Sequence, residues 1–352
     1  MRQLPLSTIA AAGGLLAALG GTSPAWAVAK TVYTSGVTAP GGLLWLKDST
    51  AAGGHLWISD HLNGFCRLDP VGTGATATID TGSCLVFGAT TQAAYDPAGK
   101  WVYIADISAK ALGVRKVAFN PVTGLLNKLK QSSLAAPTDA GGRGLRLTAA
   151  AVDSKGNLYV GNKRTGDIHV YRAGATATAG ALGTPQLVGS TEDGGGVLSF
   201  AFGKTVVPAD PTTTPPTPGF TTDDLYVAGV NSVLLMPDVN GVDPAGNASQ
   251  NGAGACSTAN PCTAVDVSFG VFTPQSVAWD GTYAYAGDVT ALHRINPADG
   301  SVVDYATGFS NLSAIAVSDK TATVARKVFG ADDASAGAAV LQGHVYRMNR
   351  QP

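Results

Sequence analysis

Short apolar runs of strand length are separated along the chain by turns rich in glycine, proline, asparagine and aspartate. The clearest copy is residues 279–300, which reads as a strand, a tight turn and two further strands. Apolar residues stand at successive positions of these runs rather than at alternating ones, as in sheets that are covered on both faces. This pattern predicts an all-β chain made of small sheets that pack against one another.

The runs repeat as a unit of three or four strands. An innermost strand that enters a turn recurs at residues 94–99, 151–156 and 278–281. The strand after it ends on or just before a carboxylate or amide residue, at Asp60, Asp106, Asn162, Asn231, Asp288 and Asp332. Sheets repeated around a centre form a β-propeller. We predict six blades, with seven as the alternative, and a ring closed by pairing of residues 30–34 with the last strand.

The repeated motif also resembles a known class of proteins. A turn glycine followed by an aromatic residue, an aliphatic residue, Ala or Gly and then Asp or Asn resembles six-bladed propellers of the NHL and SMP-30/gluconolactonase-like class. Strand ends such as Asn296-Pro297 before Gly300 also resemble YVTN-type repeats. The resemblance covers residues 28–352 and implies the propeller fold, but it says little about function.

The N-terminus has the pattern of an export signal. Arg2 precedes an apolar run over residues 9–19, and Ala25-Trp26-Ala27 matches a cleavage site. The run is too short for a membrane span of about 20 residues. We therefore expect a signal peptide over residues 1–27, a single mature domain over residues 28–352 without a transmembrane segment, and a secreted or periplasmic location.

Four cysteines fit that expectation. In an oxidising compartment, their order along the chain favours the disulfides Cys66–Cys84 and Cys256–Cys262. Two insertions interrupt the repeat. Residues 207–222 form a Pro/Thr-rich loop, and residues 241–263 form a loop that the second disulfide would tie.

Composition and charge exclude some partners. Charged residues make up 13% of the chain, against about 25% in a typical domain. The net charge is -1, so nothing points to nucleic acid or to an anionic membrane. We expect a monomer whose partner is a protein or a small polar ligand.

The repeat places two sets of polar residues at one end of the sheets. The first set is the ring of carboxylates and amides that ends the second strands, Asp60, Asp106, Asn162, Asn231, Asp288 and Asp332. Such groups suit a hard divalent cation such as calcium or a ligand with hydroxyl groups. They also cap turns by accepting hydrogen bonds from nearby backbone N–H groups, and that role explains their recurrence without any ligand.

The second set stands at the starts of the innermost strands, where SMP-30-like lactonases carry acidic and amide ligands for a divalent metal. Here these positions hold no carboxylate, so the metal ligands that the resemblance implies are not carried over. We expect instead a neutral polar channel lined by Gln92, Thr148, Ser199, Gln275 and Ser313.

These observations leave several functions open. The first hypothesis is a binding or scaffold propeller without a cofactor, which holds a protein or a small polar ligand on the face with the Asp/Asn ring. The alternative is a metal-assisted hydrolase or lyase that acts in the channel. A quinone-dependent redox protein is a weaker third hypothesis, because the five tryptophans do not recur at fixed repeat positions.

Overall fold

The computed structural model describes residues 27–50, 53–61, 63–71, 75–86, 90–107, 113–139, 142–173, 182–191, 195–209, 211–212, 218–242, 256–259, 261–267, 273–320, 325–333 and 343–349. Within these residues every regular element is a strand, which confirms the all-β prediction. In the same residues no helix is long and apolar enough to cross a membrane. The predicted signal peptide lies outside the described residues except for Ala27, and so does much of the two predicted insertions.

The strands form groups of four antiparallel neighbours, which we number as units 1 to 6 in chain order. The innermost strands are β2 (Gly42–Leu46), β6 (Thr90–Asp96), β10 (Leu147–Val152), β14 (Ser199–Val207), β18 (Ser276–Trp279) and β22 (Leu312–Val317). The second strands are β3 (His55–Asp60), β7 (Trp101–Asp106), β11 (Leu158–Asn162), β15 (Phe220–Ala228), β19 (Ala284–Gly287) and β23 (Lys327–Asp332). The third strands are β4 (Gly64–Val71), β8 (Gly113–Asn120), β12 (Asp167–Ala173), β16 (Val233–Met236), β20 (Ala291–Ile295) and β24 (Gly343–Asn349). The outermost strands are β5 (Thr76–Leu85), β9 (Leu125–Ala135), β13 (Leu182–Thr191), β17 (Cys262–Asp266), β21 (Val302–Thr307) and, from the start of the chain, β1 (Lys30–Val37).

Aspartates explain where several innermost strands turn back. Asp96 accepts hydrogen bonds from the backbone N–H groups of Ala98 and Gly99, both at 3.0 Å. Asp153 and Asp280 accept equivalent bonds in the turns after β10 and β18. A short side chain that bonds backbone just ahead of it fixes a tight turn. The repeated turn motif in the sequence is therefore the local cause of the hairpins.

The apolar core lies between the units. Buried apolar residues of the described chain form six clusters, and each cluster contains residues of two neighbouring units. One contains Phe65 of unit 1 and Ile104 of unit 2, and another contains Phe329 of unit 6 and Leu56 of unit 1. The innermost strands also meet in sequence: each contacts the next, and β22 contacts β2. A four-stranded sheet of this kind is thus buried only when it has a neighbour on each face.

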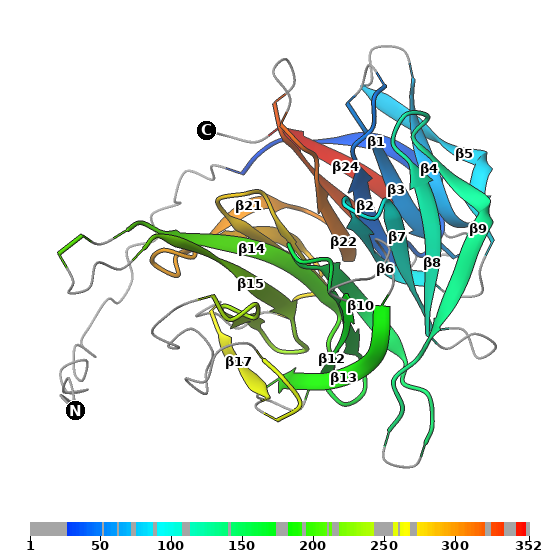
Figure 1. The fold of residues 1–352 in the computed structure, drawn as a ribbon. Helices are drawn as coiled ribbons and strands as arrows, with labels where there is room; N and C mark the ends of the chain where they lie inside the picture. Colours follow the sequence, from blue (N-terminus) through cyan, green and yellow to red (C-terminus); the bar gives the residue numbers. More distant parts are fainter. Residues whose placement is uncertain are drawn as a thin grey trace, which may run out of the picture.

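The two ends of the described chain share unit 6. Figure 1 shows β1, in blue, beside β24, in red. The two strands pair antiparallel, with Val32 opposite Tyr346. In this unit β1 is the fourth strand.

Units 3 and 4 are joined in a way that the repeat did not indicate. Their outermost strands, β13 and β17, pair in parallel, with Gly189 opposite Cys262, so the two units form one eight-stranded sheet. Both disulfides are present as predicted. Cys262 begins β17 and is bonded to Cys256, whose carbonyl oxygen accepts a hydrogen bond from Arg172 of unit 3 at 2.6 Å. The second disulfide therefore anchors this link between units.

We predict that the contact of β1 with its neighbours contributes strongly to stability. Tyr33 is 4% exposed and its ring lies 5.2 Å from that of Phe329, so Tyr33→Ala should lower the free energy of unfolding by about 3 kcal/mol. Val32 is on the same strand but 45% exposed, and Val32→Ala should cost less than about 0.5 kcal/mol. Urea unfolding of both variants measures the difference. Equal costs would contradict the role given to β1.

Candidate functional site

The structure brings the two predicted polar sets to the same end of the sheets. The start of each innermost strand pairs with the end of the second strand, as in Thr90 opposite Asp106 and Leu312 opposite Asp332. We call this end the Asp/Asn face and define it by Asp60, Asp106, Asn162, Asn231, Asp288 and Asp332. The relative positions of the two sets are those expected from the repeat.

Most members of the ring are buried and bonded within the fold. Asp60, Asp106, Asn162 and Asp332 are each at most 2% exposed. Asp60 accepts hydrogen bonds from the backbone N–H groups of Thr38 and Asn63 at 2.5 and 2.8 Å, and Asp332 accepts them from those of Ser310 and Asn311. These contacts support a structural role. Ligand binding by the ring stays a prediction.

Two further members of the ring also contact groups of the fold. Asn162 accepts a hydrogen bond from the backbone N–H group of Arg164 at 3.0 Å, and its amide donates to the hydroxyl oxygen of Thr165 at 2.7 Å. The Oδ2 atom of Asp106 lies 3.6 Å from Nε of Arg115 on β8. Asn231, in contrast, is exposed.

The hydroxyl residues of the second set join neighbouring units. Thr148 of unit 3 donates a hydrogen bond to the carbonyl oxygen of Val197, which leads into unit 4. Ser313 of unit 6 donates to that of Pro40, just before unit 1, at 2.6 Å. Ser199 of unit 4 accepts a hydrogen bond from the backbone N–H group of Val277 in unit 5 at 3.2 Å. These side chains therefore hold the innermost strands together.

Gln92 spans the centre of the molecule. From β6 its Nε2 donates to the carbonyl oxygen of Phe200 at 2.6 Å. Its Oε1 accepts from the backbone N–H groups of Ala150 and Phe200 at 3.1 and 2.8 Å. One amide thus links units 2, 3 and 4 across the channel. Gln275 behaves differently, because its exposed amide donates only locally, to the carbonyl oxygen of Thr273.

The five polar residues at the starts of the innermost strands do not fit the divalent metal that the SMP-30-like resemblance implies. Their side chains supply hydroxyl and neutral amide oxygens, most of which already bond backbone groups, whereas a hard cation favours carboxylates. Across the part of the chain that the structure describes, no group of three or more His, Cys, Asp or Glu side chains is placed to hold a metal ion.

A cavity of about 840 Å³ opens at the opposite end of the channel, within the size range of small-molecule sites. Four aromatic residues of innermost strands line it: Trp45, Tyr95, Phe202 and Trp279. We call these four residues and their cavity the aromatic mouth. Below it, a channel of about 250 Å³ is lined by all six innermost strands and includes Gln92.

Each ring of the aromatic mouth packs against a second aromatic ring. Trp45 stacks on Phe329, and Trp279 stacks on Tyr226, with ring centroids 5.9 and 5.3 Å apart. Tyr95 and Phe202 meet Phe119 and Tyr159 edge to face, both at 5.3 Å. Three of these four contacts join neighbouring units. The orientation of each ring is thereby fixed before any ligand arrives.

Two glycines make this packing possible. A Cβ atom on Gly54 would lie 2.8 Å from the Trp45 indole, and one on Gly203 would lie 2.6 Å from the Tyr226 ring. Larger residues at either position would displace a ring, so glycine is required there for a steric reason.

Charged residues surround the aromatic mouth. Lys47, Lys100, Lys204 and Asp319 line the cavity and are exposed. Asp153 and Asp223 also line it but are buried. Burial raises the pKa of Asp153, although hydrogen bonds from Asn157 and from the backbone N–H group of Lys155 counteract part of the effect.

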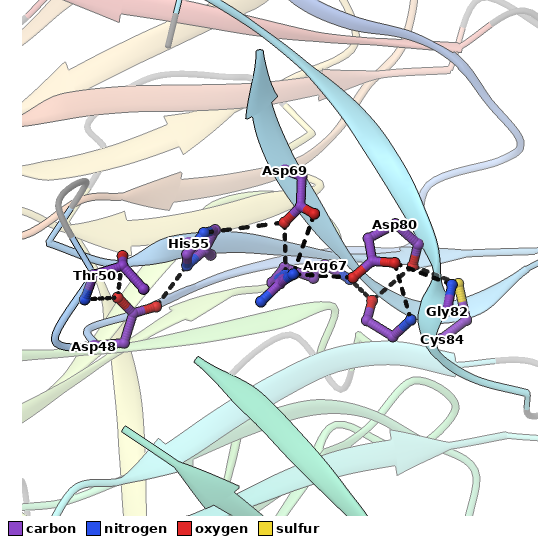
Figure 2. Close-up of polar contacts among 9 residues, drawn as sticks. Asp48, Thr50, His55, Arg67, Asp69, Asp80, Gly82 and Cys84 are labelled. Carbon is purple, nitrogen blue, oxygen red and sulfur yellow. Dashed lines mark hydrogen bonds and ion pairs between the residues drawn. The ribbon is translucent and has the colours of Figure 1, made fainter. Parts of the chain in front are cut away.

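Figure 2 shows that a further wall residue, Asp48, begins a line of polar contacts across unit 1. Its Oδ2 lies 2.5 Å from Nδ1 of His55, and Nε2 of His55 lies 4.0 Å from Oδ1 of Asp69. Arg67 connects Asp69 to Asp80, with nitrogen–oxygen distances of 2.6 and 3.1 Å. Because Asp48 is buried and bonded to His55, it stabilises the wall of the cavity.

The sequence carried a signal for the aromatic mouth that the search for polar ligands missed. Tyr95-Asp96 and Trp279-Asp280 place an aromatic residue directly before the turn aspartate, and Trp45 and Phe202 occupy the equivalent positions of β2 and β14. A search for aromatic residues at this fixed position of the repeat would have found all four.

No protein-family model and no curated protein matches the sequence of this chain. Solved structures do resemble it. A gluconolactonase from Xanthomonas campestris has 12% identity and a TM-score of 0.51, over 88% of this chain and 86% of that chain. Regucalcin from Agrobacterium tumefaciens, described as a calcium-binding protein, has 14% identity and a TM-score of 0.52, over 92% of this chain and 96% of that chain. At such identities the similarity shows the fold alone.

We predict that Gln92 stabilises the fold. Gln92→Ala removes three hydrogen bonds and leaves backbone groups of two other units without that partner, which should lower the free energy of unfolding by about 1–3 kcal/mol. Gln275→Ala is the matched control and should cost less than about 0.5 kcal/mol. Urea unfolding tests both variants. A Gln92→Ala protein as stable as the control would show that the bridge is dispensable.

The pH dependence of stability tests the structural role of Asp288. Burial opposes ionisation of this carboxyl, but hydrogen bonds from His293 and from the backbone N–H groups of Thr290 and Ala291 outweigh it and lower its pKa below 3.8. The folded state therefore favours the carboxylate. Its contribution is complete above about pH 4 and is lost as the pH falls through the lowered pKa.

We accordingly expect Asp288→Asn to lower stability at pH 7 and to have a shrinking effect below about pH 4. Urea unfolding at several pH values measures this change. Asp319→Asn, which alters an exposed carboxylate, is the control and should change stability little at pH 7. A cost of Asp288→Asn that does not vary with pH would rule out this role.

Proposed function

Taking the chain as a β-propeller of the SMP-30/gluconolactonase-like class, we propose that it is an exported binding protein whose small-molecule site is the aromatic mouth. The single observation that carries the proposal is the set of four rings around one cavity, each held by a second ring. Aromatic side chains with fixed orientations offer large contact surfaces at little entropic cost on binding.

The proposal includes a ring of six blades, one for each unit. Support comes from the contacts of the innermost strands, which lead from β2 through the other five and back to β2. The pairing of β1 with β24 supports closure by the two ends of the chain. In such a ring the innermost strands surround one channel, and the aromatic mouth is its opening on the side away from the Asp/Asn face.

Export of the protein is supported by its cysteines. All four form disulfides, Cys66–Cys84 and Cys256–Cys262, and disulfides persist in oxidising compartments. The N-terminal pattern of residues 1–27 agrees with this location. We therefore propose a secreted or periplasmic protein.

A metal-assisted hydrolase or lyase is the alternative. Similarity of fold to a gluconolactonase favours it, since that activity belongs to a protein of the same architecture. The donor groups at the starts of the innermost strands favour binding instead, because Thr148, Ser199 and Ser313 are engaged in bonds between units. No catalytic step follows from side chains committed in this way.

We predict that ligands bind through the rings of the aromatic mouth. In a thermal-shift screen of small ring-containing acids, alcohols, amines and sugars, compounds that stabilise the protein should lose affinity by about 30-fold or more in the Trp279→Ala variant. Trp101→Ala is the matched control, since Trp101 lies outside this cavity and carries Lys116 over its ring. Affinities measured by calorimetry for each compound complete the comparison.

Excess chelator and elemental analysis of the purified protein distinguish the two functions. Binding that persists in chelator supports the proposed site. The binding proposal would be wrong if hits were unaffected by Trp279→Ala, or if a stoichiometric metal were present and required for binding.

A further inference from the structure

The charges around the aromatic mouth are of two kinds, those of buried side chains and those of exposed side chains. Asp153 and Asp223 are 5% and 2% exposed, and both accept backbone hydrogen bonds: Asp153 from Asn157 at 2.8 Å, Asp223 from Ser154 at 3.0 Å. Asp48 is bonded to His55. These carboxylates are compensated by the fold, and a ligand would gain little by approaching them.

The exposed charges that line the cavity are mostly positive. Lys47, Lys100 and Lys204 line the cavity, are exposed, and make no side-chain hydrogen bond or ion pair with any residue that the structure describes. Asp319 is the exposed carboxylate among the lining residues. Long ammonium side chains can bend over a bound molecule, whereas the buried carboxylates cannot move toward it. Of the exposed charges that line the cavity, three are positive and one is negative, and this excess at the surface favours an anion there.

The rings determine the shape of the ligand. Trp45 and Trp279 each have one face covered by a second ring and also line the cavity. A flat ring can stack on such a surface, and stacked or edge-to-face contacts between rings favour binding beyond the area that they bury. A cation would gain from the same rings but would meet three lysines. A neutral polar ring would gain the ring contacts but no charge–charge attraction to Lys47, Lys100 and Lys204.

We propose that the ligand of the aromatic mouth is a small organic anion with a flat ring, and that Lys100 and Lys204 hold its acidic group. This inference rests on the proposed function. Aromatic carboxylates supply that chemistry, with a flat ring for the tryptophans and a carboxylate for the lysines, whereas a sugar acid carries its carboxylate on a puckered ring.

The test uses the full mature protein and probes that share one ring but differ in charge. They are 1-naphthoate, 1-naphthalenemethanol and 1-naphthylmethylammonium, and the sugar pair is galacturonate and galactose. Isothermal titration at low and at moderate salt gives each affinity. We expect each acid to bind at least 10-fold tighter than its neutral partner, with an advantage that shrinks as salt screens the lysines. 1-Naphthoate should bind more tightly than galacturonate, and the reverse order would overturn the requirement for a flat ring.

Variants assign the acid-binding groups. The double variant Lys100→Met/Lys204→Met should lose most of the preference for the acid, whereas its affinity for the neutral probe should stay unchanged. Lys100→Arg/Lys204→Arg should retain the preference. Lys130→Met is the matched control, because Lys130 is exposed on β9 and does not line the cavity.

The outcomes separate the two claims. Equal or tighter binding of the neutral or cationic probe, lost in Trp279→Ala, would overturn the anion proposal and leave the binding site intact. A preference for the acid that survives the double Met variant would overturn the role of the lysines. If no probe binds, or if binding ignores Trp279→Ala, the aromatic mouth is not the ligand site and both proposals are wrong.

Discussion

Every unit of this protein depends on burial of both faces of a small sheet. A four-stranded sheet with apolar residues on both faces cannot shield itself, and one packed partner would leave its other face in water. The six buried clusters solve this problem because each is shared by two units. The same requirement explains why unit 6 takes a strand from the start of the chain: without β1, the side chains of Tyr33 and Val37 would be missing from the cluster next to unit 1.

Much of this architecture was predictable because its causes are local. Turn aspartates, strand ends and the spacing of apolar runs are properties of short segments, and so the strands, their order and both disulfides could be predicted. The parallel pair of β13 with β17 could not, because Gly189 and Cys262 meet through backbone groups that every residue has. The bridge from Gln92 to Phe200 could not be predicted for a related reason. The amide of a glutamine in the channel can form hydrogen bonds either to a bound ligand or to backbone groups far away in the sequence, and the sequence does not distinguish the two.

The candidate site was harder to predict than the fold because the same residue type serves two purposes. Aspartate recurs at both ends of the sheets, and at both ends it accepts backbone hydrogen bonds, as Asp332 does near Ser310 and Asp153 near Asn157. Recurrence of a polar residue in a repeat protein thus reflects the recurrence of a turn. The aromatic residues of the mouth are more informative about a binding site, since large rings near a channel opening are not needed to make a turn.

The two ends of the channel differ because of how their side chains are satisfied. At the Asp/Asn face, Thr148, Ser199 and Ser313 use their hydroxyl groups on neighbouring backbone, which ties the innermost strands together. At the aromatic mouth, three of the four rings fill the same structural need by packing on a ring of a neighbouring unit, and a ring packed on one face keeps the other available. Side chains that bond the neighbouring backbone have less hydrogen-bonding capacity left for a ligand, whereas a ring that packs through one face can still offer its other face. Cohesion between units and ligand binding are therefore compatible at the aromatic mouth.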